Sequence, residues 1–231
     1  MTATLDVIDD VRAIIARRGL LGHPFYQAWQ RGELTLGDLR VYAGQYYHHV
    51  LAFPQYVSGA HAICPDQRDR QELLENLIEE ERGEENHPEL WLRFAEGVGA
   101  SRAAVEGAAP LPETRALVSL YRDATLRRSF PEACAALYVY ESQVPEVAKT
   151  KIAGLKRYYG IDDPRTLQFF EVHIGADEVH AEVGAGMVRR HAAEGPARSA
   201  VLETARACAD ALWSFLDGVE RTRACAAARA G

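Results

Sequence analysis

The chain has 231 residues, of which 48% are hydrophobic, so it can bury the core of one large domain or two small ones. Its 33 acidic residues outnumber the 26 basic ones, giving a formal net charge of −7. This acidic balance, without any basic block, excludes a protein that binds the nucleic-acid backbone. The four cysteines are scattered along the chain, which predicts free thiols and a cytoplasmic location rather than a secreted disulfide scaffold.

Helical patterns follow one another from the N-terminus, and strand patterns are nearly absent. Apolar residues at helical spacing from Ile8 to Ile15 predict a first amphipathic helix that ends near Gly19, and a short helix is expected over 24–31. Thr35, followed by Asp38, is typical of a capped helix N-terminus. We expect this helix to continue into a stretch, 41–65, that contains no charged side chain.

The uncharged stretch 41–65 has to be distinguished from a membrane span. It contains three histidines, two glutamines and Pro54, which are too many polar groups for a helix that faces lipid. We therefore expect a buried helix, bent near Pro54, and no transmembrane segment or membrane partner.

The remaining helices are expected at 67–85, from 87 through Phe94, at 113–126, at 131–159 with an interruption at Pro145, at 163–193 and at 196–222. The segment 99–113 is rich in Gly, Ala and Pro and is expected to be a loop. No repeat or linker divides the chain. The sequence therefore predicts one all-α domain, residues 1–231, of about seven helices.

Polar residues occupy faces of these helices that should be apolar. His173, Asp177 and His180 follow each other at spacings of four and three, so they project from one side of the helix 163–193. A buried carboxylate is costly unless it is paired or binds a metal, and two imidazoles beside one carboxylate suit a first-row metal. The alternative is a hydrogen-bonded His–Asp–His ladder near the surface.

A second candidate site lies in the acidic run before His87. Glu80 precedes His87 by seven residues and shares a side with apolar residues of its helix, but Glu81 fits the apolar stripe equally well. Periodicity does not choose between the two glutamates. An acidic run of this kind is also typical of a solvated helix face.

The third candidate is Glu141, which ends an apolar and aromatic run. A glutamate in a helix otherwise suited to burial needs a partner, either a metal or an arginine. Pro145 lacks an N–H group, so it frees the carbonyl of Glu141 and can distort the helix beside it.

The three candidate sites together supply carboxylates and imidazoles of the kind that hold two iron or manganese ions inside helical bundles. Three carboxylates leave two divalent ions with one positive charge, which a bridging hydroxide neutralises. The match to the ferritin pattern is incomplete, because only Glu84 and His87 spell Glu-x-x-His. The three sites together contain the candidate ligands Glu80, His87, Glu141, His173, Asp177 and His180.

At these residues the chain resembles the family of the chlamydial protein associating with death domains and, more broadly, the haem-oxygenase-like di-iron oxidases. Those share a fold with the TenA and PqqC proteins. The resemblance covers nearly the whole chain and is densest in His23-Pro-Phe-Tyr26-Gln-Ala-Trp29, Ala52-Phe-Pro-Gln-Tyr56, Asn86-His87, Leu90-Trp91, Tyr140-Glu141-Ser-Gln-Val-Pro145 and Ala176-Asp177.

The resemblance implies a haem-oxygenase-like seven-helix bundle with a dinuclear metal site in its core, either Fe/Fe or mixed Fe/Mn. It selects Glu80 over Glu81 and Glu84, because the family's first glutamate lies seven residues before its histidine. It also implies that O2 and an external reductant, whose donor it does not specify, take part, and that the protein forms a homodimer. The alanine-rich last helix could supply that contact.

The resemblance also implies an activity. The family makes 4-aminobenzoate, a folate precursor, from one of its own tyrosines, with a lysine of the same chain supplying the amino group. These positions match Tyr26 and Lys151, and Tyr42 and Tyr140 match aromatic positions near the family's site. One residue departs from the family pattern, because Phe169 stands where the family has a further tyrosine. If that tyrosine relays an electron or radical, Tyr140 is the candidate to take its role.

The lysine content agrees with this assignment. The chain has only three lysines, Lys149, Lys151 and Lys156, against 23 arginines. A GC-rich genome explains most of this bias, but an arginine cannot supply a neutral amine, so a required amine donor would remain a lysine.

Three other functions are compatible with parts of the pattern. A di-iron oxygenase could act on an external fatty acid or amino acid, which requires a channel with a polar anchor. A cofactor-biosynthesis oxidase resembling PqqC would need no metal. An interaction module for death domains would need an exposed stripe reserved for a partner, and none is evident.

Overall fold

Every regular element in the described part of the chain is a helix, as the hydrophobic periodicity predicts. The computed structural model describes the backbone of residues 6–230 and the side chains of 6–223 and 225. The elements are, in chain order, α1 (Val7–Arg17), the 3-10 helix η1 (Leu20–Gly22), α2 (Pro24–Arg31), α3 (Leu36–Ile63), α4 (Gln67–Glu81), α5 (His87–Gly97), α6 (Arg102–Glu106), α7 (Pro112–Leu126), α8 (Phe130–Glu141), α9 (Val144–Tyr159), α10 (Pro164–His191) and α11 (Gly195–Ala230).

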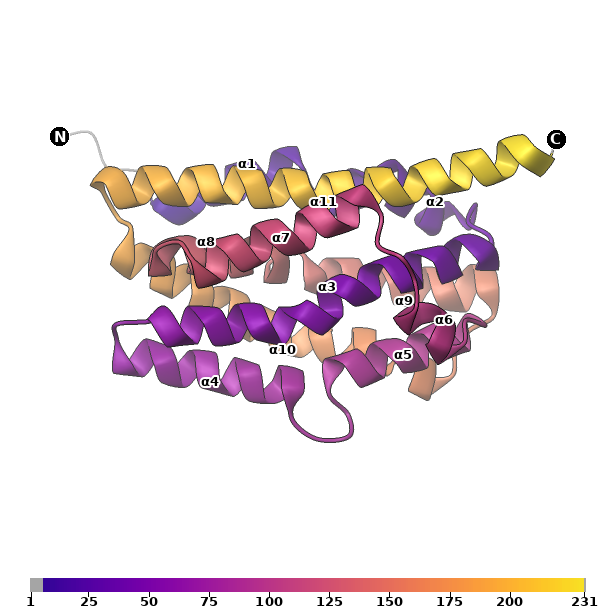
Figure 1. The fold of residues 1–231 in the computed structure, drawn as a ribbon, viewed down its shortest axis with the longest axis horizontal. Helices are drawn as coiled ribbons and strands as arrows, with labels where there is room; N and C mark the ends of the chain where they lie inside the picture. The colour runs from indigo at the N-terminus through magenta and orange to yellow at the C-terminus, as the bar shows by residue number, and fades with distance from the viewer. Residues whose placement is uncertain (1–5, 231) are drawn as a thin grey trace.

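Two long helices, α3 and α10, organise the bundle. Helix α3 packs against α4, α5 and α7, whereas α10 packs against α5, α8 and α9. Helix α11 runs along one edge of the bundle beside α7 and α8, on the side opposite α4 and α5 (Figure 1). The centre of the molecule is therefore enclosed by helices that come from distant parts of the chain.

Helix α3 begins with a capping box, as predicted. The Thr35 hydroxyl accepts from the Asp38 N–H, and the Asp38 carboxylate accepts from the Thr35 N–H. Pro54 lies inside the helix, which changes direction about halfway along its length (Figure 1).

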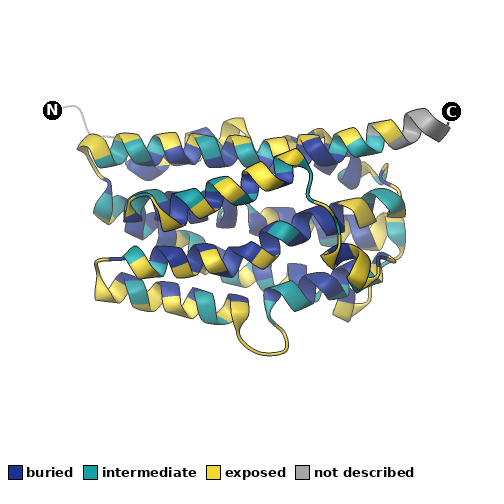
Figure 2. Ribbon diagram, in the orientation of Figure 1, coloured by how far each residue is buried: buried dark blue, intermediate teal, exposed yellow. Residues whose placement is uncertain are grey.

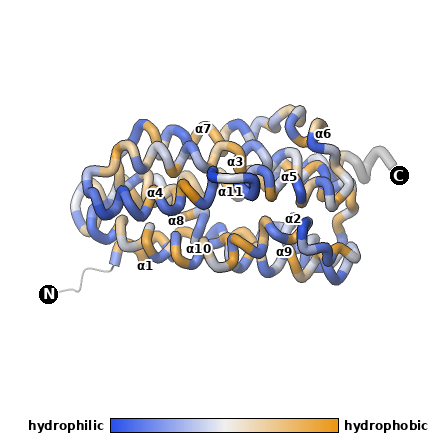
Figure 3. Tube along the Cα trace, turned by 90° about the horizontal axis from the view of Figure 1, so that it is seen from below, coloured by the Kyte–Doolittle hydropathy of each residue, from blue (hydrophilic) through white to orange (hydrophobic). Residues whose placement is uncertain are grey.

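Hydrophilic residues interrupt the hydrophobic ones along the helices (Figure 3). Among the described residues, no helix combines the length and the apolar character that crossing a membrane requires.

The described part has eleven α-helices against a predicted bundle of about seven, because several segments are divided. The stretch predicted at 131–159 is broken at Ser142 and Gln143 into α8 and α9, and Pro145 lies in the first turn of α9. The segment predicted as a loop at 99–113 contains the short helix α6. Helix α4 ends at Glu81 rather than at residue 85, and the connection to α5 is exposed (Figure 2).

The buried apolar side chains form one continuous cluster that reaches from Val7 to Val219. Several polar side chains are buried with them, including Lys151 and five of the six predicted metal ligands. Residues 1–5 and 231 belong to the predicted single domain 1–231 but lie outside the described residues, and the single-domain assignment stays a prediction.

Candidate metal centre and tyrosine–lysine cluster

The six predicted ligands meet in the centre of the bundle, in two groups of three. Within each group, one potential ligand atom per residue lies within 4.8 Å of the other two. We call the six residues the carboxylate–histidine cluster. The groups are Glu80, His87 and His173, and Glu141, Asp177 and His180.

The first group joins α4, α5 and α10. Glu80 lies in the last turn of α4 and His87 begins α5, and His87 Nδ1 is 2.7 Å from Glu80 Oε2. His173 Nδ1 donates to the backbone carbonyl of Phe169, which leaves Nε2 as an acceptor. The rings of His87 and His173 are 4.2 Å apart between centroids. Metal-binding histidines likewise donate one ring nitrogen to an acceptor such as a backbone carbonyl and bind the metal through the other, as His173 could do.

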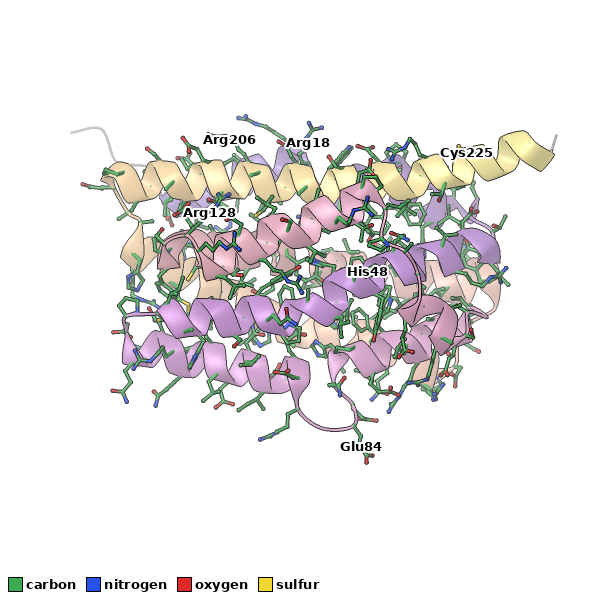
Figure 4. The ribbon with its side chains drawn as sticks, in the orientation of Figure 1. Arg18, His48, Glu84, Arg128, Arg206 and Cys225 are labelled. Atoms are coloured by element: carbon green, nitrogen blue, oxygen red, sulfur yellow. The ribbon has the colours of Figure 1, made fainter. Side chains whose placement is uncertain are left out.

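The structure separates the glutamates between which periodicity could not choose. The Glu80 side chain is buried beside His87, whereas Glu81 and Glu84 are exposed. Glu84 lies in the connection after α4 and points away from the bundle (Figure 4). The contact between Glu80 and His87 does not come from one straight helix, because α4 ends between them and Gly83 adopts a positive φ of 86°.

The second group joins α8 and α10. Glu141 is the last residue of α8, and its Oε1 is 3.9 Å from His180 Nδ1. His180 Nδ1 also lies 3.7 Å from Asp177 Oδ1, one turn earlier on α10. The side chain of His180 is 9% exposed, and Glu141 and Asp177 are each 2% exposed. Asn76 on α4 donates from Nδ2 to Glu141 Oε1 at 2.7 Å.

No arginine or lysine in the described part of the chain pairs with Glu80, Glu141 or Asp177. Burial, together with the nearby Asp177 charge, raises the pKa of Glu141 to about 8. Burial likewise raises the pKa of Asp177 to about 6. Desolvation and mutual repulsion thus oppose the ionisation of Glu141 and Asp177, and no arginine or lysine offsets these effects.

The histidines respond to the same environment. Burial opposes the charged form of His180, but the nearby carboxylates of Asp177 and Glu141 raise its pKa to about 9. Burial opposes the charged form of His87 as well, and the adjacent Glu80 raises its pKa. His173 has no such carboxylate, so burial and the neighbouring His87 lower its pKa well below the ordinary value.

The donor set fits a divalent metal pair. Two buried polar atoms of the cluster, His180 Nδ1 and Asp177 Oδ2, have no hydrogen bond, and His87 Nδ1 has only the contact with Glu80, which lacks hydrogen-bond geometry. Imidazole nitrogens and carboxylate oxygens are ligands for iron and manganese, and positive charge at this position would relieve the repulsion among the carboxylates. The six residues could therefore hold a metal cofactor.

A second polar group, the tyrosine–lysine cluster, lies among α2, α3 and α9 and consists of Tyr26, Tyr42 and Lys151. Lys151 Nζ is 2.7 Å from the Tyr42 hydroxyl, which is 2.9 Å from the Tyr26 hydroxyl. Lys151 Nζ also lies 5.1 Å from the centroid of the Tyr26 ring. All three side chains are buried. The Tyr42 hydroxyl therefore links Lys151, the predicted amine donor, to Tyr26, the predicted ring donor, inside the core.

A glycine permits the approach of α2 and α9 that brings Tyr26 to Lys151. A Cβ atom on Gly154 would lie 2.5 Å from Trp29 Cδ1, closer than any side chain allows. Trp29 Nε1 also donates to the backbone carbonyl of Lys151 at 3.3 Å. The close approach of α2 and α9, and with it the position of the tyrosine–lysine cluster, therefore requires a residue without a Cβ atom at position 154.

Lys151 differs sharply from the other two lysines. It is 3% exposed and surrounded by aromatic rings, and burial lowers its pKa well below the ordinary value, which favours the neutral amine. Lys149 is exposed and pairs with Glu146 at 2.7 Å and Glu178 at 3.5 Å. Lys156 is exposed.

A small cavity of about 10 Å³ joins the two clusters. It is lined by Tyr26 and Lys151 on one side and by His173 on the other, so the predicted reactants share a space with a predicted metal ligand. Phe169 also lines this cavity, and its ring lies 4.2 Å from that of His173. The residue that departs from the family pattern thus lies at the boundary of the two clusters.

Sequence reasoning missed two residues that connect these groups. The Tyr46 hydroxyl is 2.6 Å from that of Tyr140, and the Tyr46 ring stacks on Tyr42 at 5.3 Å. Asn76 holds Glu141. Their spacing offered a signal, because Tyr46 follows Tyr42 by one helical turn and Asn76 precedes Glu80 by one turn.

The chain is similar to known proteins over most of its length. A family model described as iron-containing redox enzyme matches residues 40–213, a range that contains both groups of the carboxylate–histidine cluster and Lys151. The 4-aminobenzoate synthase of Nitrosomonas europaea is 44% identical over 226 residues, covering 94% of this chain and 92% of the relative. That of Chlamydia muridarum is 37% identical, covering 96% and 93%.

More distant similarities extend to other proteins of this fold. A pyrroloquinoline-quinone synthase of Acinetobacter baumannii is 27% identical and covers 85% of this chain and 79% of the relative. The crystal structure of a TenA homologue from Pseudomonas syringae pv. tomato superposes with a TM-score of 0.79 at 17% identity, covering 93% and 91% of the two chains. The all-helical, haem-oxygenase-like fold expected from the sequence is thereby confirmed.

Proposed function

The chain belongs to the iron-containing redox enzymes of haem-oxygenase-like fold, and we propose that it makes 4-aminobenzoate from its own Tyr26 and Lys151. Relatives that carry the name 4-aminobenzoate synthase are 37% and 44% identical over nearly the whole chain. In this proposal Tyr26 supplies the aromatic ring, Lys151 supplies the nitrogen, O2 is the oxidant and an external reductant supplies electrons. Each chain then reacts once.

The carboxylate–histidine cluster is the proposed metal site, with all six residues as ligands. Two metals held there, both iron or one iron and one manganese, would supply the activation of O2 that the oxidation of a phenol requires. The protein's contribution is to fix the ligands in a dry interior. Asn76 orients Glu141, and the carbonyl of Phe169 orients the His173 ring.

The tyrosine–lysine cluster prepares the proposed reactants. Burial keeps Lys151 as a neutral amine, the form that can attack carbon, and the Tyr42 hydroxyl fixes its Nζ atom by a hydrogen bond. Burial raises the pKa of Tyr26, so its phenol stays protonated until it is oxidised. Tyr42, hydrogen-bonded to both groups, can carry a proton between Tyr26 and Lys151.

One observation carries the proposal: the buried Lys151 and Tyr26 share a small cavity with His173 of the carboxylate–histidine cluster. A cavity of about 10 Å³ holds about one water molecule, which leaves no room for a fatty acid or an amino acid beside Tyr26. This favours an internal substrate over an external one. The complete set of six ligands likewise disfavours a metal-free oxidase of the PqqC type.

Isotope labelling tests the proposal directly. Protein made with ¹³C-tyrosine and ¹⁵N-lysine, loaded with iron and incubated with a reductant and O2 in unlabelled buffer, should release 4-aminobenzoate that carries both labels. Peptide mass spectrometry should find the loss at Tyr26. Labelled protein that yields unlabelled product would point to an external substrate and overturn the proposal.

Two substitutions assign the residues. Tyr26→Phe and Lys151→Arg should each abolish the product and fail to rescue a 4-aminobenzoate auxotroph, because neither a phenol nor a neutral amine remains at the site. Lys149→Arg and Lys156→Arg are matched controls on the same helix, and both should retain full activity. Full rescue by Tyr26→Phe or Lys151→Arg would remove that residue from the mechanism.

The proposal includes a homodimer in the cytoplasm. The location agrees with four free cysteines, three of them buried, and with the reductant that the reaction needs. Sedimentation of the purified chain at two concentrations tests the dimer, and a monomer at both would contradict it.

A further inference from the structure

A cleft of about 90 Å³ leads from the surface to the carboxylate–histidine cluster between α4, α8 and α10. Glu141 and His180 line its inner end. It is separate from the cavity beside Lys151, which is smaller and lined mostly by aromatic and aliphatic side chains. The cleft and the cavity share no lining residue, so the cleft reaches the proposed metal site by a separate path.

One wall of the cleft is acidic. Glu72, Glu75 and Glu79 line it from α4, spaced three and four residues apart, so they follow one side of the helix for two turns. All three are exposed. The opposite wall is apolar and contains Val183 and Met187 of α10. Among the described residues that line the cleft, none is an arginine or a lysine.

A buried oxygen without a partner lies between the acidic wall and the cluster. Asn76 lines the cleft and is 5% exposed, and its Oδ1 has no hydrogen bond. The amide orientation is fixed because Nδ2 donates to Glu141 Oε1 at 2.7 Å. An unpaired amide oxygen aimed into an acidic cleft is suited to a water molecule or a cation.

Glu79 connects the acidic wall with the proposed metal site. Its Oε2 lies 3.3 Å from His180 Nε2, while His180 Nδ1 faces Asp177 at 3.7 Å. One imidazole thus contacts a surface carboxylate through one nitrogen and the buried cluster through the other. Side-chain oxygen atoms that can bind a cation therefore line the cleft from Glu72 at the surface to Glu141 in the core.

We propose that this acidic cleft is the access route and transient binding site through which divalent cations reach the carboxylate–histidine cluster. The inference rests on the metal centre of the proposed function and extends it to a part of the chain outside the six ligands. Carboxylates along a narrow cleft with an apolar wall concentrate cations and raise the association rate by about 10-fold to 1,000-fold. Glu79 is the last carboxylate before the ligands.

The rate of cobalt uptake tests the route. The full chain, stripped of metal, is mixed with Co²⁺ at low ionic strength in a stopped-flow spectrophotometer, and the cobalt absorbance gives both rate and final stoichiometry. The double variant Glu72→Gln/Glu75→Gln should load about tenfold more slowly than wild type and reach the same stoichiometry. Glu79→Gln should also load slowly.

A matched double variant separates the route from net charge. Glu81→Gln/Glu84→Gln removes the same charge from exposed positions at the end of α4 and in the connection after it, outside the cleft, and should load at the wild-type rate. In about 1 M salt the Debye length falls to about 3 Å, so the difference between the two double variants should largely disappear.

Equal loading rates for the two double variants would overturn the access route, and so would a loss of stoichiometry without a change in rate. Neither result touches the metal centre, because wild type would still bind cobalt. A wild-type chain that takes up no cobalt and no iron would instead refute the metal centre of the proposed function, and with it the route.

Discussion

The two buried polar clusters satisfy their polar groups in opposite ways. In the tyrosine–lysine cluster, the Tyr26 hydroxyl, the Tyr42 hydroxyl and Lys151 Nζ form a hydrogen-bonded chain that needs nothing from outside. In the carboxylate–histidine cluster, three carboxylates lie together without an arginine or a lysine, and several of its atoms have no hydrogen bond. One cluster is complete within the protein and the other is complete only with cations.

This difference indicates that the two clusters have separate roles, one in binding cations and the other in holding Tyr26 and Lys151 in place. A cluster that requires cations can be filled and emptied, whereas a cluster that is internally satisfied holds its members in one arrangement. Phe169 lies between them, with its ring 4.2 Å from His173 and 4.8 Å from Trp91. Four predictions test whether the two clusters can be disrupted independently.

The largest effect is expected from removing a ligand. Glu141→Ala should reduce the bound metal from about two ions per chain to less than one and abolish product, because one of the six proposed ligands is lost. The tyrosine–lysine cluster should stay intact. Metal analysis of purified protein measures the first effect, and Glu81→Ala provides an exposed control. Unchanged metal content would show that Glu141 is not a ligand.

The stability of the metal-free protein should depend on pH in a way that metal removes. The pKa of Glu141 is raised from 4.5 to about 8, so the folded state holds its proton more tightly and stability falls as pH rises through this window. The pKa of His180 is raised from 6.5 to about 9, so the stabilising effect of its protonated form is also lost as pH rises through that range. The total is on the order of a few kcal/mol.

Lys151 should contribute a slope of the opposite sign. Its pKa is lowered in the folded state, so the unfolded chain binds the extra proton and stability rises with pH towards 10.5. Denaturant titrations of metal-free protein between pH 5 and 9 measure the sum. Glu141→Gln should remove the part of the fall that Glu141 contributes, and a Glu141→Gln profile parallel to that of wild type would contradict the assignment of a raised pKa to Glu141.

A substitution at Gly154 should disturb only the tyrosine–lysine cluster. The methyl group of Gly154→Ala would overlap Trp29, so overpacking should cost about 1–3 kcal/mol of unfolding free energy and move α2 away from α9. Product should fall several-fold while metal content stays the same. Gly22→Ala is the control, because a Cβ there meets nothing within 4 Å. A parallel loss of metal would show that the clusters are not independent.

An effect on rate alone, without a loss of metal or of stability, is expected at the boundary between the clusters. Tyr140 contacts Tyr46, which stacks on Tyr42, so these phenols offer a path in place of the tyrosine that Phe169 replaces. Tyr140→Phe should slow the loss of Tyr26 about tenfold, a change of about 1.4 kcal/mol in the barrier. Phe169→Tyr in that background should recover part of the rate, measured by peptide mass spectrometry over time. If the rate does not recover, Tyr140 does not take the role of the tyrosine that Phe169 replaces.

The sequence predicted the helices because their apolar periodicity and caps are local signals, as at Thr35. It could not choose Glu80 over Glu81 from periodicity, since both follow the same apolar stripe and the choice depends on where α4 ends. The pairing of Tyr26 with Lys151 could not be derived from any local pattern either. Their helices meet only because Gly154 admits Trp29, so the assignment depended on the resemblance.

The burial of Tyr26 has a consequence for the life of each molecule. A ring that is 3% exposed is released, in the proposed reaction, inside a closed core, so the product can leave only when the helices open locally. The spent chain then lacks a core aromatic side chain, a change that costs about 3–5 kcal/mol when made by mutation. Reacted molecules should therefore unfold and be degraded first, and the supply of product would be set by how many chains the cell translates.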